Sequence, residues 1–135
     1  MKLDEIMIGD WVGHPTKGRG RVTAIQDNGV VFLDVCEDID GACEIGELEP
    51  VPIDAEILAD TGFEVTNESH GLQTWHLDSV GWVYRFDGGE WEFELIGYGA
   101  KNGGRGKYRG VLENAHQLQH ALRLVGVVRE VAVRR

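Results

Sequence analysis

The stretch IGDWVGHPTKGRGRVTAIQDNGVVFLDV, residues 8–35, decides the fold of the first part of the chain. Short apolar runs rich in β-branched residues alternate in it with turn residues, which is typical of short strands. Asp27-Asn28-Gly29 is its strongest turn signal, because Asn-Gly tolerates the positive φ of a tight hairpin. We therefore expect antiparallel strands at 6–12, 21–26 and 30–35.

Two more strands are expected shortly afterwards, at 43–45 and 48–51. Pro50 and Pro52 end this part, because proline cannot continue a strand ladder. Five short strands joined by tight turns within about fifty residues predict a small SH3-like β-barrel over residues 1–52.

The rest of the chain, residues 53–135, mixes helical and strand patterns. Asp54 is a candidate N-cap for a helix over 55–61, and Gly62 fits the left-handed position after a helix. The other expected elements are strands at 63–67, 74–77, 81–86 and 90–96, a loop at 97–110, a helix at 111–125 and a strand at 127–133. The predicted fold class is α+β: a barrel, followed by a subdomain packed on it, with antiparallel strands and an amphipathic helix.

The expected helix at 111–125 has one apolar side. Its apolar stripe follows helical spacing and comprises Val111, Ala115, Leu118, Leu122 and Val125. The opposite side is expected to be solvated and holds Glu113, His116, His120 and Arg123.

Charge is distributed unevenly along the 135 residues, whose formal net charge is -10. No Lys or Arg lies between Arg21 and Arg85, whereas this stretch holds fourteen Asp and Glu residues. Such a balance argues against a general nucleic-acid binder, which needs clustered positive charge. No apolar run could span a bilayer and no signal peptide is evident, so we expect a cytoplasmic protein with no membrane contact. Cys36 and Cys43 are expected to be reduced there, a disulfide between them being the less favoured alternative.

The glycine-rich basic loop expected at 97–110 is the leading candidate binding site. Its basic and aromatic residues are Tyr98, Lys101, Arg105, Lys107, Tyr108 and Arg109. Basic side chains contact phosphate and aromatic rings stack on bases, so single-stranded nucleic acid is a candidate ligand. Lys17 and Arg19, in the first part of the chain, are candidate contributors. The favoured alternative is a solvated hairpin or strand–helix loop without a ligand.

Two patterns resemble metal sites, and neither predicts one. His116 and His120 have the spacing of two ligands on one helix, but no third ligand is evident. Four residues match positions 3, 5, 6 and 12 of a calcium loop: Asp38, Asp40, Gly41 and Glu47. Its first position is Cys36, a soft thiol unsuited to a hard cation, so we interpret this segment as an acidic hairpin loop.

Catalytic motifs are not evident in the sequence. Neither serine, Ser69 or Ser79, lies in a nucleophile elbow, and the glycines at 13–20 do not form a phosphate loop. We therefore expect no enzyme activity and no cofactor.

Several residues near the N-terminus match a known hairpin. The segment Gly9-Asp10-Trp11-Val12, with His14-Pro15, Gly18, Gly20 and Val22 after it, resembles the opening hairpin of SH3-like modules. These include the Tudor-like C-terminal domains of some bacterial DNA helicases and the polymerase-interaction domains of transcription-repair coupling factors. Such modules bind proteins, often RNA polymerase, so the resemblance implies a protein partner.

The order of motifs along most of the chain is similar to that of a second group. The matching stretches are Ile8-Gly9-Asp10-Trp11-Val12, Glu49-Pro50-Val51-Pro52, Gly62-Phe63 and His116-Gln117-Leu118-Gln119. They resemble a family of small uncharacterised proteins of gut anaerobic bacteria and their phages. This resemblance implies an architecture and no activity.

Taken together, these patterns predict a non-enzymatic protein-binding or adaptor protein, related to phages or other mobile elements. One alternative is a nucleic-acid-binding module that uses the basic loops. Another is an acidic nucleic-acid mimic, in which the stretch 22–84 meets a basic surface that normally binds DNA. An enzyme without a recognisable motif is the least favoured class.

Overall fold

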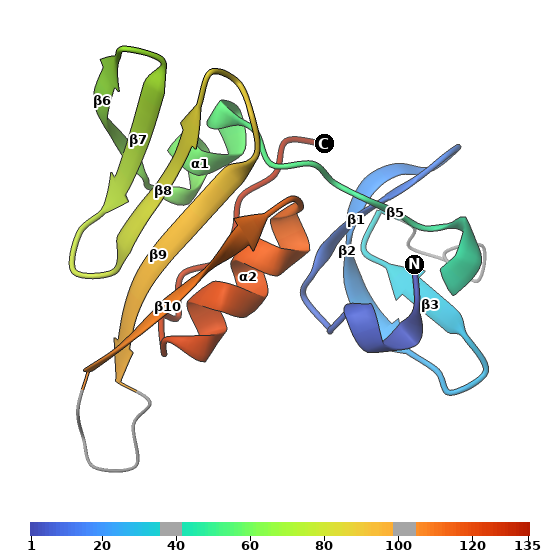
Figure 1. Cartoon of the computed structure of the whole chain (residues 1–135). Helices are drawn as coiled ribbons and strands as arrows, with labels where there is room; N and C mark the ends of the chain where they lie inside the picture. The colour runs from blue at the N-terminus through green and yellow to red at the C-terminus, as the bar shows by residue number, and fades with distance from the viewer. Residues whose placement is uncertain (36–41, 99–104) are drawn as a thin grey trace. The chain divides into compact units, whose positions relative to one another are not determined.

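A computed structural model describes residues 1–35, 42–98 and 105–135 of the chain (Figure 1). The chain divides into two compact units, Met1–Pro52 with Val133–Arg135, and Ile53–Ala132. Within the described ranges, no helix is long and apolar enough to cross a membrane. The mixture of helices with antiparallel sheets confirms the predicted α+β class.

The first unit contains one five-stranded antiparallel sheet in the order β4-β3-β2-β1-β5. Its elements are η1 (Leu3–Glu5), β1 (Trp11–His14), β2 (Gly18–Ile25), β3 (Val30–Leu33), β4 (Ala42–Glu44), η3 (Ile45–Glu47) and β5 (Glu49–Pro50). The predicted turn at 27–29 joins β2 to β3, and Gly29 has the expected positive φ of 87°. The core of this unit is formed mainly by Ile6, Val12, Val22, Val31, Leu33, Cys43 and Leu48.

This first sheet is not closed, so the predicted barrel is not shown. Strands β4 and β5 are its two edges among the described strands. Strand β5 pairs with β1 over only two residues, because Pro50 has no N–H to donate. The strand expected at 6–12 begins only at Trp11, because the Asp10 carboxylate accepts a hydrogen bond from the Met7 N–H at 2.7 Å and holds a turn.

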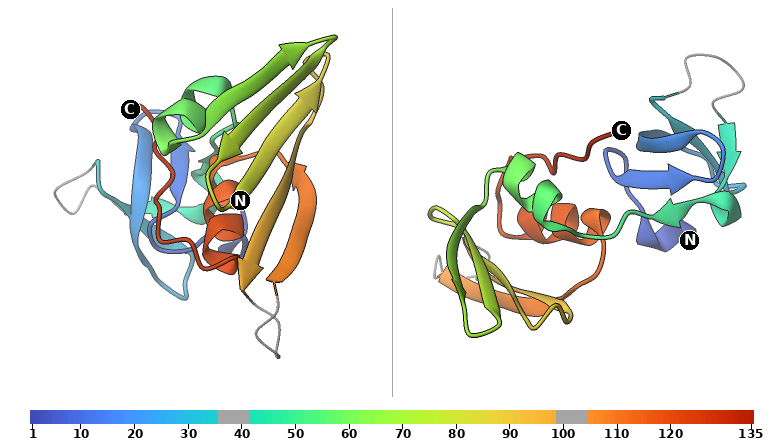
Figure 2. Two further views of the ribbon diagram at one scale, coloured as in Figure 1. Left: turned by 90° about the vertical axis from the view of Figure 1, so that its left-hand side faces the viewer. Right: turned by 90° about the horizontal axis from the view of Figure 1, so that it is seen from above.

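The second unit contains another five-stranded antiparallel sheet, in the order β10-β9-β8-β7-β6. Its elements are α1 (Ala55–Thr61), β6 (Glu64–Ser69), β7 (Leu72–Leu77), β8 (Gly81–Phe86), β9 (Trp91–Tyr98), β10 (Arg105–Leu112) and α2 (Ala115–Leu124). Figure 2 shows that both helices lie on the same side of this sheet. Helix α1 has its predicted limits: Asp54 caps it by accepting the Ile57 N–H at 2.8 Å, and Gly62 ends it with a φ of 112°.

Of the loop expected at 97–110, residues 97–98 end β9 and residues 105–110 belong to β10, which pairs antiparallel with β9; residues 99–104 lie outside the described residues. Gly97 and Gly110 lie in these strands at points where a side chain would be crowded. A Cβ at Gly97 would lie 2.6 Å from the Val125 Cβ, and one at Gly110 would lie 3.0 Å from the Phe93 ring. Glycine is thus required here by close packing and not by a turn.

Helix α2 begins at Ala115 and not at 111, because Asn114 and Gln117 form a capping box there. Val111 therefore lies in β10 and is 46% exposed, although it was expected on the buried stripe of the helix. His116, expected on the solvated side, is only 5% exposed. The rest of the predicted stripe is buried, as expected: Ala115, Leu118, Leu122 and Val125.

The strand expected at 127–133 does not form; these described residues have no assigned secondary structure. Side chains take the place of a neighbouring strand along this segment. The Gln119 Oε1 accepts the Val131 N–H at 2.8 Å, and the Thr61 hydroxyl accepts the Ala132 N–H at 3.1 Å. The β-branched residues of this segment were interpreted as a strand, but Val131 and Val133 are buried without pairing to a neighbouring strand.

Candidate functional site

The second sheet has a helix-facing side and an outer side. Trp75, Val83 and Leu95 are buried on the helix-facing side. Residues at the alternate positions of the same strands therefore point outward, away from α1 and α2 (Figure 2). We call this the outer face of the second sheet and treat it as the candidate site.

One row of direct cross-strand partners crosses the outer face from β6 to β10. The row comprises Glu64, His76, Trp82, Glu94 and Arg109. The ring centroids of His76 and Trp82 are 5.1 Å apart, and the planes are tilted by 33°. Arg109 Nη2 lies 3.3 Å from Glu94 Oε1, a surface ion pair between neighbouring strands. The row thus combines a stacked aromatic pair with charges of both signs.

Aromatic side chains on this face are open to solvent. Trp82 is 38% exposed and Phe86 is 58% exposed, although both lie in β8. Tyr84, between them on the same face, is half-buried and lies opposite Glu92 of β9. Trp11, Trp75 and Trp91 are buried, so Trp82 is the exposed tryptophan of the chain.

A polar hollow of about 430 Å³ lies at the β6–β7 end of the row. It is lined by Gly62, Glu64, His76, Leu77, Asp78 and Arg129. The Arg129 guanidinium donates to the Thr61 carbonyl at 3.1 Å, so it is held against the end of α1. Nowhere in the described ranges do three or more His, Cys, Asp or Glu side chains group to hold a metal ion.

The residues of the predicted basic loop are placed by the β9–β10 hairpin. Lys107 and Arg109 point to the outer face, and both approach Glu94, at 3.7 Å and 3.3 Å. Tyr108 is half-buried and lies opposite Leu95 on the helix-facing side. Tyr98 and Arg105 are cross-strand partners, but their side chains lie outside the described residues, as does Lys101 entirely. Glu94, in the neighbouring strand β9, therefore partly neutralises the positive charge of Lys107 and Arg109.

Lys17 and Arg19, the other predicted basic residues, belong to the first unit, whereas the β9–β10 hairpin belongs to the second. The Lys17 ammonium donates to the Ala42 carbonyl at 3.3 Å and lies 3.6 Å from Cys43 Sγ. Arg19 is half-buried in β2. No single unit holds all the basic residues that the nucleic-acid hypothesis needs.

His14 was missed by sequence reasoning. Its Nδ1 accepts the Thr16 and Lys17 N–H groups, both at 3.2 Å, so the ring proton is on Nε2. That Nε2–H donates to Glu47 at 2.9 Å and lowers the pKa of this carboxyl. Because its side chain is only 6% exposed, His14 organises the β1–β2 turn and is not a surface base. The one sign of this role in the sequence is that the turn-forming residues Pro15 and Thr16 follow His14.

The two weak metal patterns do not gain support. The rings of His116 and His120 are 5.7 Å apart, but His116 is buried, with only 5% of its surface exposed. Glu47, the last position of the calcium-like pattern, hydrogen-bonds His14. The other positions, and Cys36 with its expected thiol state, lie outside the described residues.

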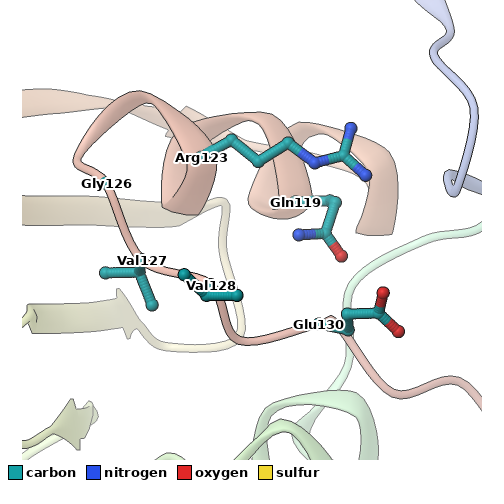
Figure 3. A pocket seen from close by; sticks show the side chains of 6 residues that line it. All are labelled: Gln119, Arg123, Gly126, Val127, Val128 and Glu130. Atoms are coloured by element: carbon teal, nitrogen blue, oxygen red, sulfur yellow. The ribbon is translucent and has the colours of Figure 1, made fainter.

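A second hollow, of about 400 Å³, lies between α2 and the segment that follows it (Figure 3). Gln119 and Arg123 project into it from α2, and Val127, Val128 and Glu130 line the opposite side. The Gln119 side-chain amide hydrogen-bonds the backbone of this segment. We therefore interpret the hollow as a gap where α2 packs against the segment that follows it.

Comparison with known proteins adds no assignment: no family model, curated protein or solved structure matches the chain.

Proposed function

We propose that the chain is a non-enzymatic, protein-binding adaptor whose second unit binds a partner through the outer face of the second sheet. The observation that carries this proposal is Trp82, exposed in the middle of a sheet beside His76 and Glu94. Exposed aromatic side chains on a rigid surface are typical of interface hot spots, where tryptophan contributes most. Burying Trp82 and Phe86 against a partner would remove apolar surface from water.

Away from Lys107 and Arg109 at the β10 edge, the charges on the outer face favour a partner with basic groups. Glu64 and Glu92 lie on the same face as Trp82, on the two sides of β7 and β8, whereas Glu94 is paired with Lys107 and Arg109. Carboxylates repel phosphate, which supports a protein partner over a nucleic acid. They can pair with lysine or arginine of a partner at the rim of an aromatic patch.

The first unit is proposed to be SH3-like in its connections. Its strand order supports this, because β1 lies between β2 and the short β5, as in a barrel that closes through its last strand. Its acidic residues form only part of the long acidic stretch, since residues 22–52 and 53–84 belong to different units. The acidic stretch therefore does not by itself favour a nucleic-acid mimic over an adaptor.

The test compares proteins captured from a host lysate by the wild-type chain and by two variants. Trp82→Ala truncates the exposed aromatic of the outer face. Val128→Ala is the matched control, because Val128 is 94% exposed and lies outside that face. We expect a protein retained by the wild type and by the control to bind Trp82→Ala at least about tenfold more weakly, as for a hot-spot residue.

The captured protein is then purified and its affinity for each variant measured directly. Equal affinity for Trp82→Ala and the wild type, with both variants folded by circular dichroism, would exclude the outer face as the binding surface. Capture of no protein at any salt concentration would contradict the adaptor function itself.

A further inference from the structure

An apolar groove of about 400 Å³ lies between the edge strand β10 and helix α2, apart from the outer-face row. It is lined by Phe93, Val111, Gln117, His120, Ala121 and Leu124. The four helix residues are spaced as one stripe, so the groove extends along about 10 Å of α2. That length accommodates about three residues of an extended chain. Figure 1 shows α2 alongside β10.

Strand β10 ends the second sheet, with β9 as its only neighbour among the described strands. An edge strand presents N–H and C=O groups that another extended segment can pair with. Its eight residues, Arg105–Leu112, are a longer template than most edge strands offer. The edge of β10 therefore offers backbone pairing beside a groove that α2 lines on its other side.

Apolar surface is available at the side of the groove next to the helix. Leu124 of α2 is 61% exposed. The ring of Phe93 reaches the groove because Gly110, its direct cross-strand partner, has no side chain. An apolar side chain that points from an added strand toward α2 would contact Phe93 and Leu124.

Positive charge lies on the other side of β10. Lys107 and Arg109 are two residues apart and point to the outer face, with 63% and 65% of their side chains exposed. Both share one carboxylate, that of Glu94, so one positive charge remains uncompensated within this cluster. No acidic residue lies in β10 itself. Residues of an added strand that face Lys107 and Arg109 would therefore be acidic.

We propose that β10 and α2 bind an extended acidic–apolar–acidic segment of a partner protein, which adds to the sheet as a further strand. Alternation of side chains in a strand separates the two requirements. The acidic residues lie opposite Lys107 and Arg109 on the outer face, and the next apolar residue, opposite Gly110, enters the groove at Phe93 and Leu124. Backbone pairing with an edge strand supplies affinity, and the alternate side chains supply specificity. The groove and the edge of β10 are separate from Trp82, although Arg109 and Glu94 also belong to the outer-face row. The inference therefore does not depend on a partner bound at Trp82.

The probe is a fluorescent heptapeptide with aspartate at its odd positions and valine at its even positions. Its binding to the full chain is followed by anisotropy and by amide chemical shifts. We expect shift changes at β10 and α2, and at least about tenfold weaker binding of the same peptide with lysine in place of aspartate. No binding of the aspartate peptide, or equal binding of the two peptides, overturns the proposal.

Strand addition is tested by N-methylation of the peptide. One peptide is methylated at the amides of its odd positions and another at the amides of its even positions. Only one edge of an added strand bonds to β10, so one of the two peptides should lose binding while the other keeps it. Equal behaviour of the two methylated peptides contradicts strand addition.

Variants of the chain test the two sides of the groove. Leu124→Asp should weaken binding at least about tenfold, whereas Val128→Asp, a similar change at a residue 94% exposed outside the groove, should leave it unchanged. The double variant K107E/R109E should reverse the preference from the aspartate to the lysine peptide, and K107Q/R109Q should abolish the preference. Trp82→Ala should not change peptide binding. Loss of peptide binding in Trp82→Ala, or an unchanged preference in K107E/R109E, places the peptide elsewhere.

Discussion

At the scale of single residues, an ion pair of the first unit joins Asp34 to Arg135. Both guanidinium nitrogens of Arg135 donate to the two oxygens of Asp34, and the guanidinium carbon lies 5.1 Å from the Trp11 ring centroid. The hydrogen bond from Arg135 holds the pKa of Asp34 below its ordinary value of 3.8. Arg135 is thereby held against the sheet of the first unit.

Asp34→Asn is expected to lower the free energy of unfolding of the first unit by about 0.5–1 kcal/mol at pH 7, as for a partly exposed ion pair. A lowered folded-state pKa stabilises the fold above the unfolded-state pKa and loses this effect as the pH falls through the lowered value. The difference between variant and wild type should therefore be full above about pH 5 and disappear in acid. Urea denaturation across pH measures it.

The control for this prediction is Asp27→Asn, in the exposed turn between β2 and β3. We expect its stability to follow the wild type at every pH. A difference for Asp34→Asn that grows as the pH falls would contradict the ion-pair explanation.

At the scale of elements, α2 is buried on more sides than an ordinary surface helix. Its apolar stripe packs against the sheet, while Gln119, 2% exposed, faces the segment after the helix. The amide of Gln119 accepts the Val131 N–H at 2.8 Å and donates to the Arg129 carbonyl at 3.4 Å. The Gln119 side chain therefore supplies hydrogen bonds to this segment that a neighbouring strand would otherwise supply.

Gln119→Ala should lower the free energy of unfolding by about 1–3 kcal/mol, because the buried Val131 N–H loses its acceptor. Hydrogen exchange should accelerate at Val131 before it accelerates in β8 or β9. Gln26→Ala, at an exposed position in the first unit, serves as the control and should leave both measurements unchanged. Unaltered exchange at Val131 in Gln119→Ala would mean that the amide does not hold the segment.

Elements differ in how far the sequence predicted them. Helix α1 and the strand at 81–86 have their predicted limits, because an N-cap, a C-terminal glycine and a two-residue alternation are local signals. Strand β10 was predicted as a loop, because its glycines signal turns unless the packed helix is known. The sequence named Lys107 and Arg109 as candidate site residues. It did not show that Glu94 lies next to them or that Trp82 lies beside His76, because both depend on strand register.

At the scale of the whole molecule, the net charge of -10 opposes the folded state through repulsion among carboxylates. Ion pairs at Glu94 and Asp34 offset this repulsion locally. Because the acidic stretch is divided between two units, each unit carries part of this repulsion.

Raising sodium chloride from about 10 to about 150 mM shortens the Debye length from about 30 to about 8 Å, and should therefore raise the thermal unfolding midpoint. We expect an increase of roughly 2–4 °C, which corresponds to a change below about 1 kcal/mol. Differential scanning calorimetry at constant pH measures it. A lower midpoint at the higher salt concentration would show that the ion pairs outweigh the net repulsion.

The sequence by itself determined what depends on neighbours a few residues away. The capped helix α1, the turn at 27–29, the alternation in β8 and β9 and the α+β class belong to this group. Tertiary structure decided that a glycine-rich segment forms β10, that His116 and Gln119 are buried, and that Thr61 binds the N–H of Ala132, 71 residues away. The physical reason is that each of these depends on which distant surface satisfies a backbone group or covers a side chain, and local propensity does not encode that partner.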